Sequence, residues 1–176
     1  MPRAPVFVSM PSKLGQPQQT TYDFLSELLH QYRIEGCTVG RTDHALGTPL
    51  GEVYRLAKRC SGGLILGFRQ MKAQNVTMWP GSPREAVHPG DTYAPSMWNH
   101  LEAGILFSLG VPLLVFAEDG VSGGIFDRGV GDIFIHPLPI GDLDNEQKEN
   151  FSALVSEWSR HVVNHYRDDI SKNWRR

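Results

Sequence analysis

The sequence predicts an α/β fold in which helices cover both faces of a mostly parallel, five-stranded sheet. Short apolar runs alternate along the chain with longer segments whose apolar residues recur about every 3.6 positions. Turns rich in glycine, proline and polar residues separate the two kinds of segment. Strands that alternate with helices pair in parallel through right-handed crossovers, so a ligand crevice is expected at the carboxyl ends of the strands.

The first part of the chain supplies three of the expected strands and two helices. The expected strands span residues 6–8, 37–39 and 64–68. We expect Thr20 or Thr21 to cap the first helix, whose apolar stripe continues to Tyr32. The second helix is marked by the apolar positions Leu50, Val53, Tyr54 and Ala57.

The pattern changes after the third strand. Between Arg69 and Pro95 the periodicity fails, and prolines and glycines accompany Met78 and Trp79. We expect a long irregular loop here, which serves as a lid or as an interface between subunits.

Regular elements resume beyond this loop. We expect a helix over about 97–109, strands at 113–116 and 133–135, and a glycine-rich turn at 120–124 between them. A long amphipathic helix closes the chain, with Asp142 or Asp144 as its start signal.

Composition limits the classes of function. A chain of 176 residues with 40% hydrophobic content predicts one domain, spanning residues 1–176, with a substantial core. The net charge of -2 and the absence of long basic runs argue against nucleic acid as a partner and favour a small ligand. No apolar run approaches the roughly 20 residues that span a bilayer, and no signal-peptide core follows the first residues. We therefore expect a soluble, cytoplasmic protein that does not bind membranes.

Metal and disulfide chemistry is not expected either. The only cysteines are Cys37 and Cys60, which form no CxxC pair, so a disulfide framework or a structural zinc site is not predicted. His161 and His165 have helical spacing for two ligands, but no third ligand is predicted beside them, and we expect no metal site.

One carboxylate stands out near the start of the helix expected at 97–109. Ser96 is predicted as its N-cap, which puts Glu102 in the second turn. The spacing of Trp98, Asn99 and Glu102 places them on one helix face, distinct from the apolar face that carries Leu101. If the helix dipole acts on Glu102, its carboxylate is expected to be ionised at neutral pH, which suits a cationic transition state. A solvated helix with an incidental tryptophan is the alternative interpretation.

This segment resembles a known family. Ser96-Met97-Trp98-Asn99-His100-Leu101-Glu102 is similar to the S-x-W-C-x-x-E segment of TIR domains, with Asn99 in place of the usual cysteine. The continuation Glu102-Ala103-Gly104 is closer to the E-x-G pattern of nucleoside 2-deoxyribosyltransferases. Both families share a flavodoxin-like three-layer sandwich with a glutamate on an equivalent helix. The resemblance implies that Glu102 is the catalytic carboxylate.

The resemblance also implies an activity and partners. TIR-like proteins hydrolyse or cyclise NAD at the nicotinamide N-ribosyl bond, act in bacterial antiphage defence through NAD depletion or a nucleotide signal, and self-associate on activation. On this interpretation NAD is the substrate, no cofactor is required, and a downstream effector senses the nucleotide product.

The leaving group separates the enzymatic alternatives. Nicotinamide departs from NAD as a neutral molecule, so one carboxylate that stabilises the oxocarbenium-like sugar is enough. A purine or pyrimidine leaves better when protonated, and the deoxyribosyltransferases have an Asp where Ser96 stands; Asp91 is a weak substitute. This comparison favours NAD. The alternatives are a nucleoside 2-deoxyribosyltransferase or nucleotide N-glycosidase, and a non-catalytic nucleotide-sensing or scaffold module.

Polar residues after the first two strands complete the expected substrate-binding set. Ser9, Ser12 and Lys13 follow the first strand and Asp43 follows the second, so all four are expected at the ligand-facing edge. Each also has a structural interpretation, since serines satisfy turn backbone groups and a lysine is usually solvated. The expected substrate-binding residues are Ser9, Ser12, Lys13, Asp43, Ser96, Trp98 and Asn99.

Overall fold

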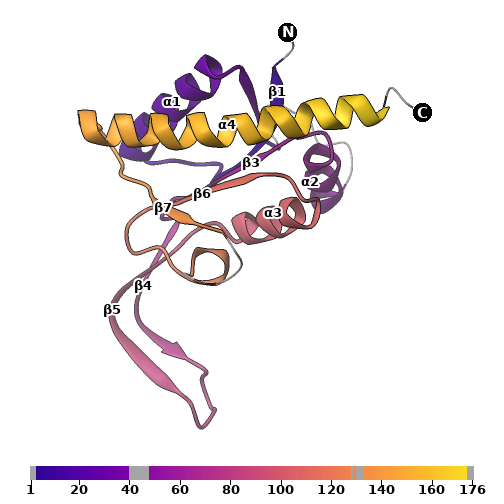
Figure 1. Cartoon of the computed structure of the whole chain (residues 1–176). Helices are drawn as coiled ribbons and strands as arrows, with labels where there is room; N and C mark the ends of the chain where they lie inside the picture. The colour runs from indigo at the N-terminus through magenta and orange to yellow at the C-terminus, as the bar shows by residue number, and fades with distance from the viewer. Residues whose placement is uncertain (1–2, 40–47, 128, 130–132, 174–176) are drawn as a thin grey trace.

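A five-stranded parallel sheet forms the centre of the computed structural model, which describes residues 3–39, 48–127, 129 and 133–173 (Figure 1). Its strands are β1 (Ala4–Ser9), β2 (Ile34–Cys37), β3 (Gly63–Gly67), β6 (Leu113–Ala117) and β7 (Ile135–Pro137). Their order in the sheet is β2-β1-β3-β6-β7, and every neighbouring pair is parallel. This is the flavodoxin-like order, in which the sheet grows outward on both sides of β1.

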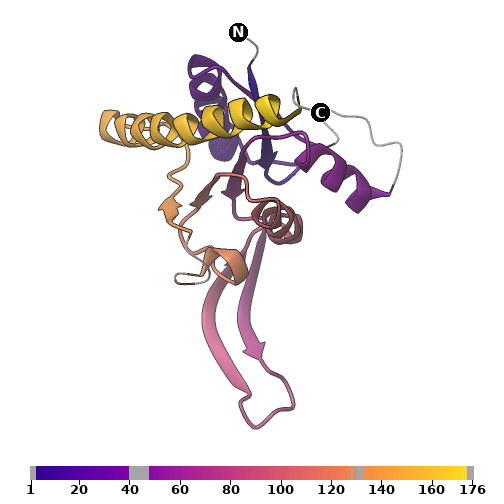
Figure 2. The ribbon, with the colours of Figure 1, turned by 45° about the vertical axis from the view of Figure 1, so that its right-hand side comes forward.

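Four helices cover the two faces of the sheet, which gives the expected three layers. They are α1 (Gln16–Gln31), α2 (Pro49–Ala57), α3 (Met97–Ser108) and α4 (Asn145–Asn173). α1 and α4 lie on one face and α2 and α3 on the other, as the two views in Figures 1 and 2 show. None of these helices is both long and apolar enough to cross a membrane, within the part of the chain that the structure describes.

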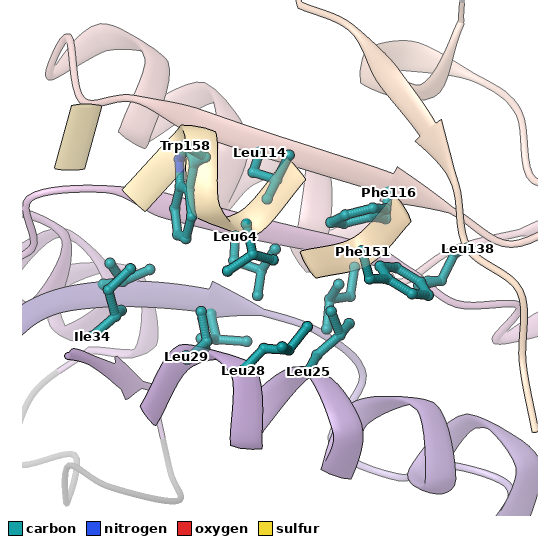
Figure 3. Close-up of a cluster of buried hydrophobic side chains, with 14 of the residues drawn as sticks. Leu25, Leu28, Leu29, Ile34, Leu64, Leu114, Phe116, Leu138, Phe151 and Trp158 are labelled. Carbon is teal, nitrogen blue, oxygen red and sulfur yellow. The ribbon is translucent and has the colours of Figure 1, made fainter. Parts of the chain in front are cut away.

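The larger core cluster lies under α1 and α4. Leu25 and Leu28 of α1 point toward the sheet residues Leu64 and Phe116, and Phe151 of α4 packs against Phe116 with ring centroids 5.1 Å apart (Figure 3). The sheet residues are buried because helices cover both faces, which explains why the strands read as continuous apolar runs in the sequence.

The first helix begins earlier than the sequence predicts. α1 starts at Gln16, whereas Thr20 or Thr21 was expected as its cap. Gly15 is the N-cap, and its backbone N–H donates to the Gln18 side chain at 3.0 Å. The expectation was wrong because a glutamine supplied the capping contact in place of a hydroxyl side chain.

Two edge strands are shifted from their expected positions. β2 ends at Cys37 instead of beginning there, because Ile34 is fully buried and pairs with Ala4 in the register of β1. β7 begins at Ile135, since Phe134 is 84% exposed and lies outside the strand. In both strands the apolar signal is short, and pairing with the neighbouring strand decides the boundaries.

The start of α4 agrees with the sequence. The Asp144 carboxylate accepts from the Gln147 backbone N–H at 2.8 Å, and the Gln147 side chain accepts from the Asp144 backbone N–H at 3.1 Å. This reciprocal pair satisfies two backbone donors at the helix start.

The expected irregular loop between Arg69 and Pro95 is a β-hairpin, so that prediction was wrong. β4 (Met71–Met78) and β5 (Ala86–Ala94) pair antiparallel and project away from the sheet (Figures 1 and 2). Most of the hairpin is exposed on both faces, and Trp79 at its turn is 57% exposed. Without a buried face the strands lack the alternation of apolar and polar residues by which half-buried strands are recognised.

A matched pair of glycine substitutions tests the packing of the sheet end. A Cβ on Gly67 would overlap the Phe126 ring, whereas a Cβ on Gly104 in α3 meets no atom within 4 Å. We expect Gly67→Ala to cost about 1–3 kcal/mol in the free energy of unfolding. Gly104→Ala is expected to stabilise by roughly 0.5–1 kcal/mol because it reduces the backbone entropy of the unfolded chain. Urea titrations of both variants measure this, and equal effects of the same sign would contradict the packing at Gly67.

Candidate active site

Three buried polar side chains meet where β1 ends and α3 passes over it. Ser9 is the last residue of β1 and is 1% exposed; Asn99 and Glu102 of α3 are 0% and 9% exposed. The sheet order reverses at β1, whose neighbours β2 and β3 are reached by crossovers on opposite sides. The carboxyl end of the strands at such a switch point is where doubly wound proteins bind ligands.

The start of α3 fixes the positions of these side chains. Ser96 is the N-cap, as the sequence predicts, and its hydroxyl accepts from the Trp98 backbone N–H at 3.3 Å. Asn99 and Glu102 lie three residues apart, so both point to the same side of the helix. Ser96 therefore acts as a helix cap in this structure.

The helix face that buries Glu102 differs from the one expected. Asn99 and Glu102 share the buried face with Ala103, while Leu101 is 51% exposed. The expectation that Leu101 belongs to an apolar face separate from the polar one was wrong, because the face that packs on the sheet carries Asn99 and Glu102 together with Ala103. Trp98 lies one turn before Glu102 and is 43% exposed, at the boundary of the buried face.

Burial controls the charge of Glu102. Desolvation raises the pKa of the Glu102 carboxyl from its ordinary value of 4.5 to about 7, and a hydrogen bond from Ser9 opposes part of this rise. Burial therefore favours the protonated form of Glu102 at pH values where an exposed glutamate is already ionised. The expectation that the helix dipole keeps Glu102 ionised was wrong, because the dipole effect is smaller than the cost of removing a carboxylate from water.

Asn99 links the site to two strands. Its Nδ2 donates to the Ser9 hydroxyl oxygen at 2.8 Å and lies 3.5 Å from the Leu66 carbonyl oxygen of β3. Its Oδ1 is buried and has no hydrogen-bond partner. The site thus combines the titratable carboxyl of Glu102 with the polar side chains of Ser9 and Asn99, which are joined by a hydrogen bond.

The structure places the other predicted residues differently. Ser12 and Lys13 are exposed in the connection between β1 and α1, at the same edge of the sheet as Ser9. Asp43 lies outside the described residues. The structure therefore brings together Ser9, Asn99 and Glu102, and it leaves Ser12 and Lys13 on the surface.

Sequence reasoning missed a second buried carboxylate at this edge. Glu118 follows β6, is 5% exposed, and accepts from the Gln18 side chain at 2.8 Å and from the Arg69 backbone N–H at 2.9 Å. The Arg69 guanidinium lies 4.0 Å from the centroid of the Tyr93 ring. Glu118 therefore ties α1 to the base of the hairpin. Its position directly after a buried strand is the signal that points to it.

A cavity of about 770 Å³ opens at the ends of β6 and β7 beside α4, and Ser9, Asn99 and Glu102 do not line it. Its walls include Phe116, Phe126 and Phe151, and its buried carboxylate, Glu118, already accepts two hydrogen bonds. Glu102, the buried carboxyl whose pKa is raised, lies outside this cavity, so the candidate active site is the Glu102 cluster. Among the described residues, no three His, Cys, Asp or Glu side chains converge as metal ligands.

The strand order and the Glu102 cluster define a flavodoxin-like α/β protein with a buried carboxyl at its topological switch point. Comparison with protein-family models and with curated proteins found no match. Among solved structures, the chain is similar to a CMP N-glycosidase from Clostridium botulinum, BcmB, at 16% sequence identity and a TM-score of 0.49. The alignment covers 85% of this chain and 97% of that one. The fold assignment rests on the strand order and the helix layers.

The raised pKa of Glu102 predicts how stability depends on pH. The folded protein binds this proton more tightly than the unfolded chain does, so the stabilisation from protonation is complete below 4.5 and is lost as the pH rises to about 7. Glu102→Gln removes this dependence. We expect the variant to be more stable than the parent by about 3 kcal/mol at about pH 8, and the difference to shrink toward about pH 4.

Urea unfolding of both proteins across this range measures the difference. A difference that is independent of pH would show that Glu102 titrates normally.

Proposed function

We propose that this protein cleaves the N-glycosidic bond of a nucleotide or nucleoside, with Glu102 as the catalytic carboxyl. The observation that carries the proposal is a buried carboxyl with a pKa of about 7 at the ligand-binding edge of a doubly wound sheet. Breaking this bond leaves positive charge on the sugar, and a nearby carboxylate stabilises that charge or traps it covalently.

Glu102 has two uses in such a reaction. When the bond between C1′ and the base nitrogen breaks, the electron pair goes to the base and water then adds to C1′. In its ionised form Glu102 stabilises the cationic sugar; in its protonated form it donates its proton to a departing neutral base. A pKa of about 7 makes both forms available at neutral pH, and this favours a nucleotide with a neutral purine or pyrimidine base.

NAD is the second candidate substrate, supported by the lone carboxyl in the cluster. Asp91, the sequence's weak candidate for a second acid, lies on the hairpin and pairs with Lys72 at 2.7 Å. Nicotinamide leaves NAD without protonation, so a single ionised carboxylate is sufficient. If NAD is the substrate, the resemblance to TIR domains suggests NAD hydrolysis or cyclisation in antiphage defence, with an effector that senses the product.

The pH dependence of turnover distinguishes a substrate with a neutral leaving base from NAD. A neutral leaving base needs the protonated form of Glu102, so kcat/KM falls as the pH rises through about 7. With NAD the ionised form is needed, so kcat/KM falls as the pH drops through the same value.

Trp98 flanks Glu102 from its exposed position and is proposed to contact the substrate base.

Substitution of Glu102 tests the proposal directly. We expect Glu102→Gln to retain the fold and to lower turnover by on the order of 10²-fold or more, because it removes the charge and the transferable proton. The assay follows base or nicotinamide release by NMR with NAD, with ribonucleotides and with deoxynucleosides.

Glu149→Gln, which changes an exposed glutamate of α4, is the matched control. Base exchange between deoxynucleosides would identify a transferase, and binding without release in any arm would identify a non-catalytic nucleotide-sensing module. Wild-type turnover in Glu102→Gln would remove Glu102 from the mechanism.

We also propose that the protein self-associates through the hairpin. Met71, Met78, Trp79 and Val87 are large apolar residues that the hairpin exposes. Exposed apolar side chains on a projecting element are typical of interfaces. We expect specific activity to rise with protein concentration, and Trp79→Ala to reduce both this rise and the apparent mass.

Light scattering on the assayed samples measures the mass, and Phe134→Ala, which removes an exposed ring from the edge of the sheet, is the control. A monomer with constant specific activity, unchanged by Trp79→Ala, would leave the hairpin without a role in assembly.

A further inference from the structure

The outer side of α3 is apolar along the length of the helix. Its large exposed side chains are Met97, Trp98, Leu101 and Phe107, which are between 43% and 63% exposed. The structure describes the whole helix, and its one charged residue, Glu102, lies on the buried face. A helix at the surface of a monomer usually has charged and polar residues on its outer side, whereas a helix that is apolar all round is usually covered all round.

The other three long helices follow the usual pattern. Asp23 on α1, Arg55 on α2 and Glu149 on α4 are all exposed, so each of these helices has charge on its outer side. The apolar outer side is therefore a property of α3 and not of the chain as a whole.

A glycine lies in the middle of this outer side. Gly104 is exposed, and a Cβ built on it meets no described atom within 4 Å. Its φ is not positive, so neither backbone conformation nor a close neighbour in the described chain requires glycine there. Glycine makes a helix interior less stable than alanine does. Its presence is accounted for if a second helix approaches α3 at this point, because the distance between packed helices depends on the side chains at the contact.

We infer that two copies of the protein pack α3 against α3 through this outer side. The contact surface, which we call the α3 face, consists of Met97, Trp98, Leu101, Gly104 and Phe107. It is separate from the hairpin and lies on the side of α3 away from Glu102. The inference does not depend on the proposed function.

A second copy is the partner that best matches the α3 face. An uncharged surface does not attract an acidic or a basic one, so its complement is another uncharged surface. Among the four long helices as far as they are described, α3 alone has such an outer side. The same patch on both subunits is the arrangement of a two-fold dimer, which is the commonest oligomer of soluble proteins.

The α3 face is large enough for a dimer contact. Its exposed side chains offer on the order of 500 Å² per copy, so two copies would bury about 1,000 Å², the area at which specific interfaces begin. The neighbouring helix α2, which contacts α3, also exposes Leu50 and Tyr54. The apolar surface on this side of the sheet is therefore not confined to α3.

Antiparallel packing at Gly104 gives the contact a defined register. Leu101 precedes the glycine by three residues and Phe107 follows it by three, on opposite sides of it. A two-fold axis at Gly104 therefore puts Leu101 level with the partner's Phe107, while the two backbones approach at the glycines. Antiparallel packing also sets the two helix dipoles against each other, which is the favourable arrangement.

Sedimentation velocity of the full chain over a concentration series tests the interface. All proteins carry Trp79→Ala, so that the hairpin does not contribute to the mass. We expect Trp79→Ala protein to dimerise and the addition of Gly104→Leu to make it monomeric, because the new side chain blocks the approach of the helices. The space around Gly104 is open within one chain, so the fold is expected to be retained. Asn164→Leu, at an exposed neutral position of α4, is the matched control and is expected to leave the dimer intact.

Two introduced charges test the register. Leu101→Lys and Phe107→Glu each place a charge in the α3 face, and each is expected to raise the dimer Kd by roughly tenfold or more. The double variant is expected to recover dimerisation, because the two opposite charges lie level across the two-fold axis. Within one chain these positions are six residues apart and do not contact each other, so recovery has to come from the partner.

The outcomes are separate from those of the activity assays, because the mass measurement needs no substrate. A monomeric Trp79→Ala protein, or a dimer that neither Gly104→Leu nor Leu101→Lys weakens, would overturn the inference. Failure of the double variant to recover would overturn the antiparallel contact at Gly104. If Gly104→Leu does not fold, as judged by circular dichroism, the charge variants still decide.

Discussion

The desolvation of one carboxyl is the constraint on which the site depends. Glu102 is held out of water by the helix that carries it, because the hydrogen bonds at the start of α3 and the packing of Ala103 direct its buried face toward the end of β1. The sheet order puts that strand end at the switch point, where the crossovers diverge and leave room for a ligand. The face of α3 that packs on the sheet therefore also determines how far Glu102 is removed from water.

The parts of the fold that the sequence predicts well are those whose signal is local. β3 and β6 are covered on both faces and read as unbroken apolar runs, and Ser96 and Asp144 mark helix starts through contacts within one turn. β2 and the hairpin were misjudged because their identity depends on pairing: β2 has a single buried anchor in Ile34, and the hairpin has almost no buried side chain. Pairing between distant segments leaves little trace in a single sequence.

The same distinction holds for the site. The motif and the helix spacing singled out Glu102, the position after the first strand singled out Ser9, and both side chains are buried in the structure. The ionisation of Glu102 was misjudged because the helix dipole is a local property, whereas burial is set by the whole fold. Glu118 was missed because its partners Gln18 and Arg69 come from other elements. Residue identity can be predicted from pattern, but electrostatic environment cannot.

On the proposed function, the charge of a carboxyl whose pKa lies near neutrality depends on the substrate that binds beside it. A cationic group that binds beside Glu102 favours the ionised form and lowers its pKa, whereas a neutral ligand that displaces water removes solvation and raises it further. NAD would thus favour the ionised form of Glu102, which its cleavage needs. A neutral base would favour the protonated form, which the departure of that base needs. The Ser9 hydrogen bond acts against the second effect, because it stabilises the ionised form. On the proposed function, the balance between this hydrogen bond and burial would set which leaving groups the site accepts.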